Sequence, residues 1–433
     1  MRAAGRDSTI AAPMATPAQQ LAPRTRGGGA APARGDYSRR PGAPKAGGRI
    51  AAAAALLALV ALLAGCGRDL PPSAAAPPPD DGLAPLRPDA IRGACLVVGT
   101  EASPGYDPVR GAAELKRLAT LGTRWISLGP HGRQASLDAR RIDFPDPGPY
   151  RVEEADLVQA LRDAKARGFR VLWAPHLWIT PELWRGDIRQ RTEAAWEEWF
   201  AAYGAFLRHH AQLAAREQAD MLSVGLELGG TIGREKEWRA LIAEVRGIFP
   251  GPLTYAANWW HEVEAVPFWD ALDRIGVQFF YPLASSTAAT PGDLRAGLER
   301  IRAGLEAVAE AAGRPYLFTE VGYRSSPAPW VEPWVWRVAL PEDEVDQALC
   351  LRLVVETFRD APRFGGMFVW NWYLAPEQMR TVDRRFSPQG KRAEGVVGAA
   401  YGGAAVGQST SQFEAEGEAT GAPVPAAAPG GNR

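Results

Sequence analysis

The sequence has few of the side chains that bind metals or form disulfides, with three Cys and five His among 433 residues. The His residues show no HExxH or other ligand spacing, so we expect no catalytic metal and no cofactor; they stand at positions 131, 176, 209, 210 and 261. Cys95 lies in an apolar strand-like run and Cys350 in a helical one. Both are expected to be small buried residues, and nothing in the sequence supports a disulfide between them.

The chain also lacks a net charge and a nucleotide-binding loop. Basic and acidic side chains balance at 49 each, and loss of the first 65 residues, which hold nine basic and two acidic groups, leaves 40 against 47. A slightly acidic chain does not attract nucleic acid. No Gly-rich dinucleotide fingerprint and no P-loop follows the early strands, which disfavours an open nucleotide-binding sheet.

Residues 1–65 have the layout of a secretory signal. A long basic region precedes the uncharged stretch IAAAAALLALVALLA at residues 50–64, which is too short for a comfortable membrane span. It runs into LLAGC at 62–66, which resembles the bacterial lipobox and makes Cys66 the expected lipid-bearing first residue of the mature protein. We therefore expect an exported protein, lipid-anchored in the bacterial cell envelope and facing the periplasm or exterior.

Two further segments are not expected to form part of a folded core. Residues 66–89 are rich in Pro and Ala, which predicts a stiff, extended tether. Residues 396–433 are dominated by Gly, Ala, Pro, Gln and Glu, which predicts a disordered low-complexity tail. One folded domain, over residues 90–395, remains.

Within residues 90–395, short apolar runs alternate with longer amphipathic ones, as in a parallel sheet with crossover helices. Eight strand-like runs are present, at residues 94–99, 125–129, 170–174, 221–226, 253–257, 275–280, 316–319 and 366–370. One intervening helix is expected to begin at Thr290-Pro291-Gly292-Asp293, which supplies an N-cap and a first-turn Pro. The pattern predicts a single (β/α)8 TIM barrel of class α/β, with a doubly wound open sheet as the alternative.

Two carboxylates stand where strands of this barrel would end. The fourth strand runs into Gly225-Leu226-Glu227, and the apolar seventh strand LFTEV holds Glu320. An ionised group on a buried strand is costly unless it is paired, and the C-terminal strand ends of a TIM barrel form its active site. Two carboxylates facing one cavity are what a glycosidase requires, one as acid and the other as nucleophile or base.

Aromatic and polar side chains follow the neighbouring strands. Aromatic faces stack on the apolar face of a pyranose, while Asn, His and Tyr form hydrogen bonds to its hydroxyls. The expected carbohydrate-binding residues are His176 after strand three, Asn258, Trp259 and Trp260 after strand five, Tyr281 after strand six, and Trp370, Asn371 and Trp372 after strand eight. For Trp370, a place in the barrel core is an equal alternative.

Several sequence blocks follow one another in a specific order and spacing: WRGDI at 184–188, LSVGLEL at 222–228, YAANWW at 255–260, WDALDRIGVQFFYPL at 269–283, RPYLFTEVGYRS at 314–325, GMFVWNWY at 366–373 and FSPQGKRAE at 386–394. In these blocks, residues 92–397 resemble the clan A glycoside hydrolases, and more narrowly the TIM-barrel family 113, whose characterised activity is endo-acting β-1,4-mannanase. The resemblance implies Glu227 as acid/base and Glu320 as nucleophile of a retaining hydrolase of β-linked polysaccharide or oligosaccharide, with β-1,4-mannan as the expected substrate.

Two positions depart from the clan A pattern. The residue before the acid/base, commonly Asn, is Leu226 here. The strand-six aromatic, expected to orient Glu320 and hold it ionised at a low pKa, is Tyr281, with Phe280 as the rival. The alternative function is therefore a non-catalytic carbohydrate-binding or envelope scaffold protein on a degenerate barrel. Apart from carbohydrate and the membrane no partner is expected, and the protein is expected to be a monomer.

Overall fold

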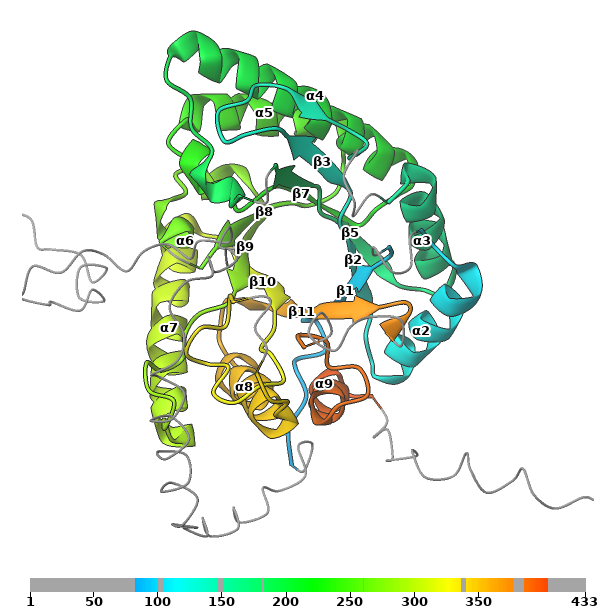
Figure 1. The fold of residues 1–433 in the computed structure, drawn as a ribbon, viewed down its shortest axis with the longest axis vertical. Coiled ribbons are helices and arrows are strands. Elements are labelled where there is room, and N and C mark those ends of the chain that lie inside the picture. The colour runs from blue at the N-terminus through cyan, green and yellow to red at the C-terminus, as the bar shows by residue number, and fades with distance from the viewer. Residues whose placement is uncertain are drawn as a thin grey trace, which may run out of the picture.

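The computed structural model describes residues 82–99, 105–146, 152–180, 183–259, 261–335, 340–376 and 385–403. Eight strands close into a parallel barrel in the order β1-β11-β10-β9-β8-β7-β5-β2, with helices around the outside (Figure 1). This confirms the predicted (β/α)8 barrel, and each of the eight strand-like runs forms one of its strands. Cys66 and the rest of the expected signal lie outside the described residues.

The barrel strands are β1 (Ile91–Val97), β2 (Trp125–Leu128), β5 (Arg170–Trp173), β7 (Met221–Leu226), β8 (Leu253–Asn258), β9 (Arg274–Phe279), β10 (Tyr316–Val321) and β11 (Phe364–Tyr373). The helices are α2 (Pro108–Thr120), α3 (Glu154–Ala166), α4 (Glu193–Arg216), α5 (Glu235–Ile248), α6 (Glu262–Ala265), α7 (Pro291–Ala312), α8 (Glu344–Phe358) and α9 (Arg392–Tyr401). Among the described residues, no helix is both long and apolar enough to cross a membrane.

Helix α7 begins as its sequence predicts. The Thr290 side chain accepts from the N–H of Asp293 at 3.2 Å, the Asp293 side chain accepts from the N–H of Thr290 at 2.8 Å, and Pro291 occupies the first turn. The helix ends at Gly313, whose φ of 64° is accessible to Gly at little cost. Two satisfied termini explain why this helix could be located from the sequence.

Apolar side chains fill both the inside of the barrel and the layer between strands and helices. The inner cluster is Ile91, Cys95, Trp125, Leu172, Ala174, Met221, Leu317 and Phe368. Gly93 makes room for it, because a Cβ at this position would lie 2.3 Å from the Phe368 ring. Cys95 and Cys350 are both buried free thiols, as expected.

A small sheet beyond the barrel mouth was not predicted. It has the order β4-β3-β6, with β3 at His131–Gln134, β4 at Ile142–Asp143 and β6 at His176–Ile179. Strands of two to four residues are too short to produce a recognisable alternation. The sheet matters for the site because β6 follows β5 directly and begins with His176, so it holds this residue at the C-terminal end of the barrel.

Both ends of the domain extend beyond the predicted boundaries. Leu86, in the expected tether, is buried, and Arg87 donates to the carbonyl of Ala361 at 2.9 Å. Helix α9 continues to Tyr401, which is buried and donates its hydroxyl to the carbonyl of Gly93 at 2.8 Å. The expectation of disorder from residue 396 was therefore wrong for 396–403, where Val and Tyr side chains pack despite the surrounding Gly and Ala.

Candidate active site

Both strands that carry the expected carboxylates contain an extra residue near their C-terminal end. From Ser223 to Leu226, β7 advances three residues while β8 advances two. From Phe318 to Glu320, β10 advances two residues while β9 advances one. A bulge of this kind re-aims the side chains that follow it, and bulges are common beside active sites. Here it pairs Glu320 with Gln278 across β10 and β9.

Glu227 follows β7 in a left-handed backbone conformation, with a φ of 52°. Its N–H donates to the carbonyl of Ala256 at 2.9 Å, and the next N–H, of Leu228, donates to the hydroxyl of Tyr255 at 2.8 Å. A left-handed Glu is unfavourable unless its surroundings enforce it. The two hydrogen bonds to β8 therefore fix the direction in which the Glu227 carboxylate projects.

Each oxygen of the Glu227 carboxylate has a partner. Asn258 Nδ2 donates to Oε1 at 2.7 Å, and Arg185 Nη2 lies 3.3 Å from Oε2. The ion pair is well shielded from water, since the Arg185 and Glu227 side chains are only 15% and 13% exposed. Although the preceding residue is a buried Leu226, an amide therefore still lies beside Glu227, supplied by the neighbouring strand.

Arg185 was not predicted as a site residue. It begins the one-turn 3₁₀ helix Arg185–Asp187, where no strand or helix periodicity marks it, and its guanidinium lies 5.5 Å from the centre of the Trp178 ring. Burial raises the pKa of Glu320, and the charge of Arg185 opposes that rise; burial lowers the pKa of His176, and the same charge lowers it further. Arg185 thus pairs with Glu227 and also acts electrostatically on Glu320.

His176 lies beside Glu320. Its Nε2 lies 3.6 Å from Glu320 Oε1, and its Nδ1 lies 2.7 Å from the carbonyl of Ala174, which requires the ring hydrogen to be on Nδ1. Burial, followed by the charge of Arg185, lowers the pKa of His176 to about 4. The ring is therefore neutral at neutral pH and turns the lone pair of Nε2 toward Glu320.

The expected low pKa of Glu320 was wrong. Burial raises the pKa of Glu320 to about 7, while the charge of Arg185 and the side chain of Gln278 oppose the rise. Tyr281 does not supply the expected hydrogen bond: within the described ranges none joins it to Glu320, and its ring instead packs edge-on against Trp259 at 5.7 Å. In place of the Tyr281 hydroxyl, His176 at 3.6 Å and the strand partner Gln278 lie beside Glu320.

Three aromatic residues from the loops after β8, β9 and β10 form one aromatic wall, made of Trp259, Tyr281 and Trp334. The rings of Trp259 and Trp334 stack with their centres 4.9 Å apart and their planes inclined by 26°. Trp334 was not predicted because it lies far along the loop after β10, outside any strand end. Trp260 lies outside the described residues, so its predicted role stays a prediction.

The residues predicted at the end of β11 do not share one face. Trp370 is partly buried and packs against the inner cluster of the barrel, so of its two predicted places the barrel core is the one observed. Asn371 is buried and donates to the hydroxyl of Tyr373 at 2.9 Å. Trp372 was wrongly predicted to bind carbohydrate: it is 1% exposed and donates its Nε1–H to Glu114 of α2 at 2.7 Å. An extra residue in β11 before Trp372 breaks the strand alternation.

A third carboxyl group, also not predicted, lies behind Asn258. Glu262 is the first residue of α6 and is 4% exposed. Burial raises its pKa to about 8, and hydrogen bonds from Tyr255 and from the backbone of Asn258 oppose the rise. Nothing in the run NWWHE distinguishes this Glu from a solvent-exposed helix-start residue.

Comparison with known proteins identifies the family. The model of Glycoside Hydrolase Family 113 matches residues 100–391. The chain belongs to glycoside hydrolase family 113. It is therefore a glycoside hydrolase built on a TIM barrel, as its resemblance to clan A implied. No curated protein sequence matches this family 113 chain.

Solved structures of family 113 enzymes resemble the whole domain. A structure described as a complex of a family 113 β-1,4-mannanase is 26% identical, with a TM-score of 0.63, and the alignment covers 72% of this chain and 99% of that one. The β-mannanase AaManA from Alicyclobacillus acidocaldarius, in complex with ManMIm, is 27% identical with a TM-score of 0.63, covering 72% and 97%.

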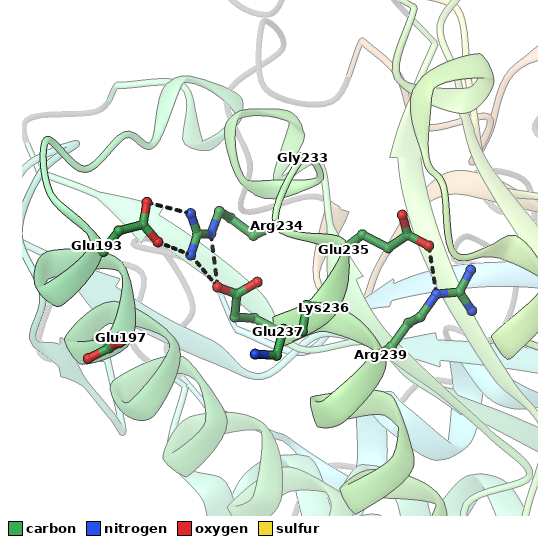
Figure 2. A pocket seen from close by; sticks show the side chains of 8 residues that line it. All are labelled: Glu193, Glu197, Gly233, Arg234, Glu235, Lys236, Glu237 and Arg239. Carbon is green, nitrogen blue, oxygen red and sulfur yellow. Dashed lines mark hydrogen bonds and ion pairs between the residues drawn. The ribbon is translucent and has the colours of Figure 1, made fainter.

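Figure 2 shows a different feature of this family 113 enzyme, a surface groove of about 790 Å³ lined by residues of α4, α5 and the segment before α5. Within it, Arg234 forms ion pairs with Glu193 and Glu237. Neither Glu227 nor Glu320 lines the groove. Because its central charges pair with one another, this groove is not the candidate active site, which remains the carboxylate cluster around Arg185.

Proposed function

We propose that this enzyme cleaves β-1,4-linked mannan by double displacement, with Glu227 as acid/base and Glu320 as nucleophile. The observation that supports the proposal most is the convergence of both carboxylates on Arg185 and His176, in a chain that belongs to family 113. Mannan is favoured over other β-linked glycans because the similar solved structures are described as β-mannanases.

In the first step, a Glu320 oxygen forms a bond to the anomeric carbon while the glycosidic carbon–oxygen bond breaks. Glu227 gives its proton to the leaving oxygen, so the aglycone departs as an alcohol. In the second step, Glu227 takes a proton from water, and the water oxygen displaces Glu320 from the anomeric carbon. The product keeps the β configuration because each displacement inverts it once.

Arg185 suits both steps electrostatically. It lies 3.3 Å from Glu227, and its charge opposes the rise that burial causes in the pKa of Glu320. A cation in this position stabilises whichever carboxyl group has lost its proton. Glu320 is ionised before the first step and Glu227 after it, so the same guanidinium serves the two states.

The aromatic wall is proposed to hold the sugar. Trp259, Tyr281 and Trp334 follow strands adjacent to the two carboxylates, and aromatic faces beside a cavity favour the apolar face of a pyranose. Asn258 and His176 are proposed to contact substrate hydroxyls in addition to the carboxylates.

A screen on oligosaccharides of β-mannan, glucomannan, xylan and cellulose tests the substrate. The chain without its first 65 residues should cleave mannan and glucomannan and leave xylan and cellulose intact. Glu320→Ala should abolish the activity, and added azide should partly restore turnover as a glycosyl azide of inverted anomeric configuration. Activity on xylan or cellulose alone would refute mannan as the substrate, and unchanged turnover in Glu320→Ala would refute its role as nucleophile.

We also propose that the enzyme is exported and held in the bacterial envelope by a lipid on Cys66. LLAGC after an apolar segment supports this, as does the Pro-rich stretch that follows and would separate the barrel from the bilayer. A polysaccharide substrate outside the cell membrane is consistent with this location.

A further inference from the structure

Glu262 lies directly behind the proposed acid/base, although it belongs to a different loop. Its carboxyl group is buried at the start of α6 and accepts two hydrogen bonds, one at each oxygen. The hydroxyl of Tyr255 donates to Oε1, and the backbone N–H of Asn258 donates to Oε2 at 3.0 Å. Both donors belong to β8, the strand next to the one that carries Glu227.

The same two residues hold Glu227 from their other sides. The Tyr255 oxygen accepts the N–H of Leu228 at 2.8 Å, which anchors the left-handed turn at Glu227. The Asn258 side chain donates to Glu227 Oε1 at 2.7 Å. Glu262 is therefore connected to Glu227 by two hydrogen-bonded paths. One runs through Tyr255 to the backbone beside Glu227, and the other runs through Asn258 to the Glu227 carboxylate.

The space around Glu262 leaves it little freedom. A methyl group added at Gly229 would come within 3.4 Å of Glu262 Oε2, so the carboxyl group packs against the segment that follows Glu227. A carboxyl group can accept a hydrogen bond at both oxygens, whereas an amide accepts at one only and presents donors at the other. No other side-chain type of this length would satisfy Tyr255 and Asn258 together.

We infer that Glu262 is a positioning residue for the acid/base Glu227, acting through Tyr255 and Asn258. The inference rests on the proposed function, because it assigns Glu262 to proton transfer at the leaving group. The charged and titratable groups that face it are Tyr255 from β8, Glu227 after β7 and Arg185 from the 3₁₀ turn.

A comparison of leaving groups tests the inference. Departure of a sugar alcohol needs the proton of Glu227, whereas departure of a dinitrophenolate does not. Glu262→Gln should lower kcat/KM on mannotetraose by about 10-fold or more and should lower kcat/KM much less on a dinitrophenyl β-mannoside. The ratio kcat/KM is compared because it reports the first displacement, whereas kcat also contains the water step in which Glu227 acts as the base for both substrates. Tyr255→Phe should show the same selectivity. Glu264→Gln, an exposed residue of the same helix, is the matched control and should behave as wild type.

Equal losses on both substrates, or no loss in Glu262→Gln, would overturn the inference. A crystal structure of Glu262→Gln adds a result that depends on no substrate: the Asn258–Glu227 hydrogen bond of 2.7 Å should lengthen or break. An unchanged Glu227 side chain in that structure would also overturn the inference. If wild type cleaves neither mannoside, the proposed function fails, and the crystal structure still decides whether Glu262 positions Glu227.

Discussion

Lowering the pH tests whether Glu320 is the nucleophile, because only its carboxylate can attack an anomeric carbon. Burial raises the pKa of Glu320 to about 7, so protonation should remove activity as the pH falls below neutral. The acid limb, the low-pH side of the kcat/KM profile, reports the pKa of an essential group in the free enzyme. Along it kcat/KM should fall about tenfold per pH unit. At about pH 5 roughly one hundredth of the enzyme carries the carboxylate, so kcat/KM should be about 100-fold below its plateau.

The assay is kcat/KM for mannohexaose between about pH 4 and about pH 9, with circular dichroism at each pH to exclude unfolding. Arg185→Met removes the cation that opposes the raised pKa of Glu320, so the limb should move to higher pH. His176, with a pKa lowered to about 4, cannot account for a limb near neutrality. Burial raises the pKa of Glu262 to about 8, and a limb that persists in Glu262→Gln does not belong to Glu262.

Two results would refute this reasoning. A folded enzyme whose acid limb lies near 4.5, the ordinary value for Glu, would show that burial does not raise the pKa of Glu320 in solution. A limb that does not move in Arg185→Met would show that Arg185 does not act on the group that titrates.

Three further predictions concern single side chains. Trp259→Ala should weaken oligosaccharide binding by roughly 1 to 3 kcal/mol in isothermal titration while the melting temperature stays close to wild type; unfolding would make this a core residue. Trp372→Ala should instead destabilise the fold by about 3 to 5 kcal/mol in urea titration, because the ring is buried against α2; weakened binding at unchanged stability would contradict that. Cys66→Ala should move the full-length protein from the membrane to the soluble fraction, and a wild type that is already soluble would refute the anchor.

The barrel could be predicted because its strands are marked locally. Runs such as residues 275–280 are mostly apolar, as buried parallel strands require, and helices such as α7 carry their own caps. Glu227 and Glu320 were located for the same reason, since both stand at the end of a recognisable strand.

The contacts between loops could not be predicted in this way. The extra residues in β7, β10 and β11 change which side chains share a face, and only the register with the neighbouring strand reveals them. Arg185 and Trp334 lie in loops whose paths carry no periodic signal. The pKa of Glu320 depends on burial by surrounding elements, so a strand sequence alone gave the wrong direction.

The configuration of the first product tests double displacement at Glu320 most directly. Proton NMR during early hydrolysis of a β-mannooligosaccharide resolves the two anomers of the new reducing end before they interconvert. Two successive inversions predict that the β anomer forms first and that the α anomer grows in only by mutarotation. An α anomer formed first would show a single displacement by water and would contradict Glu320 as a covalent nucleophile.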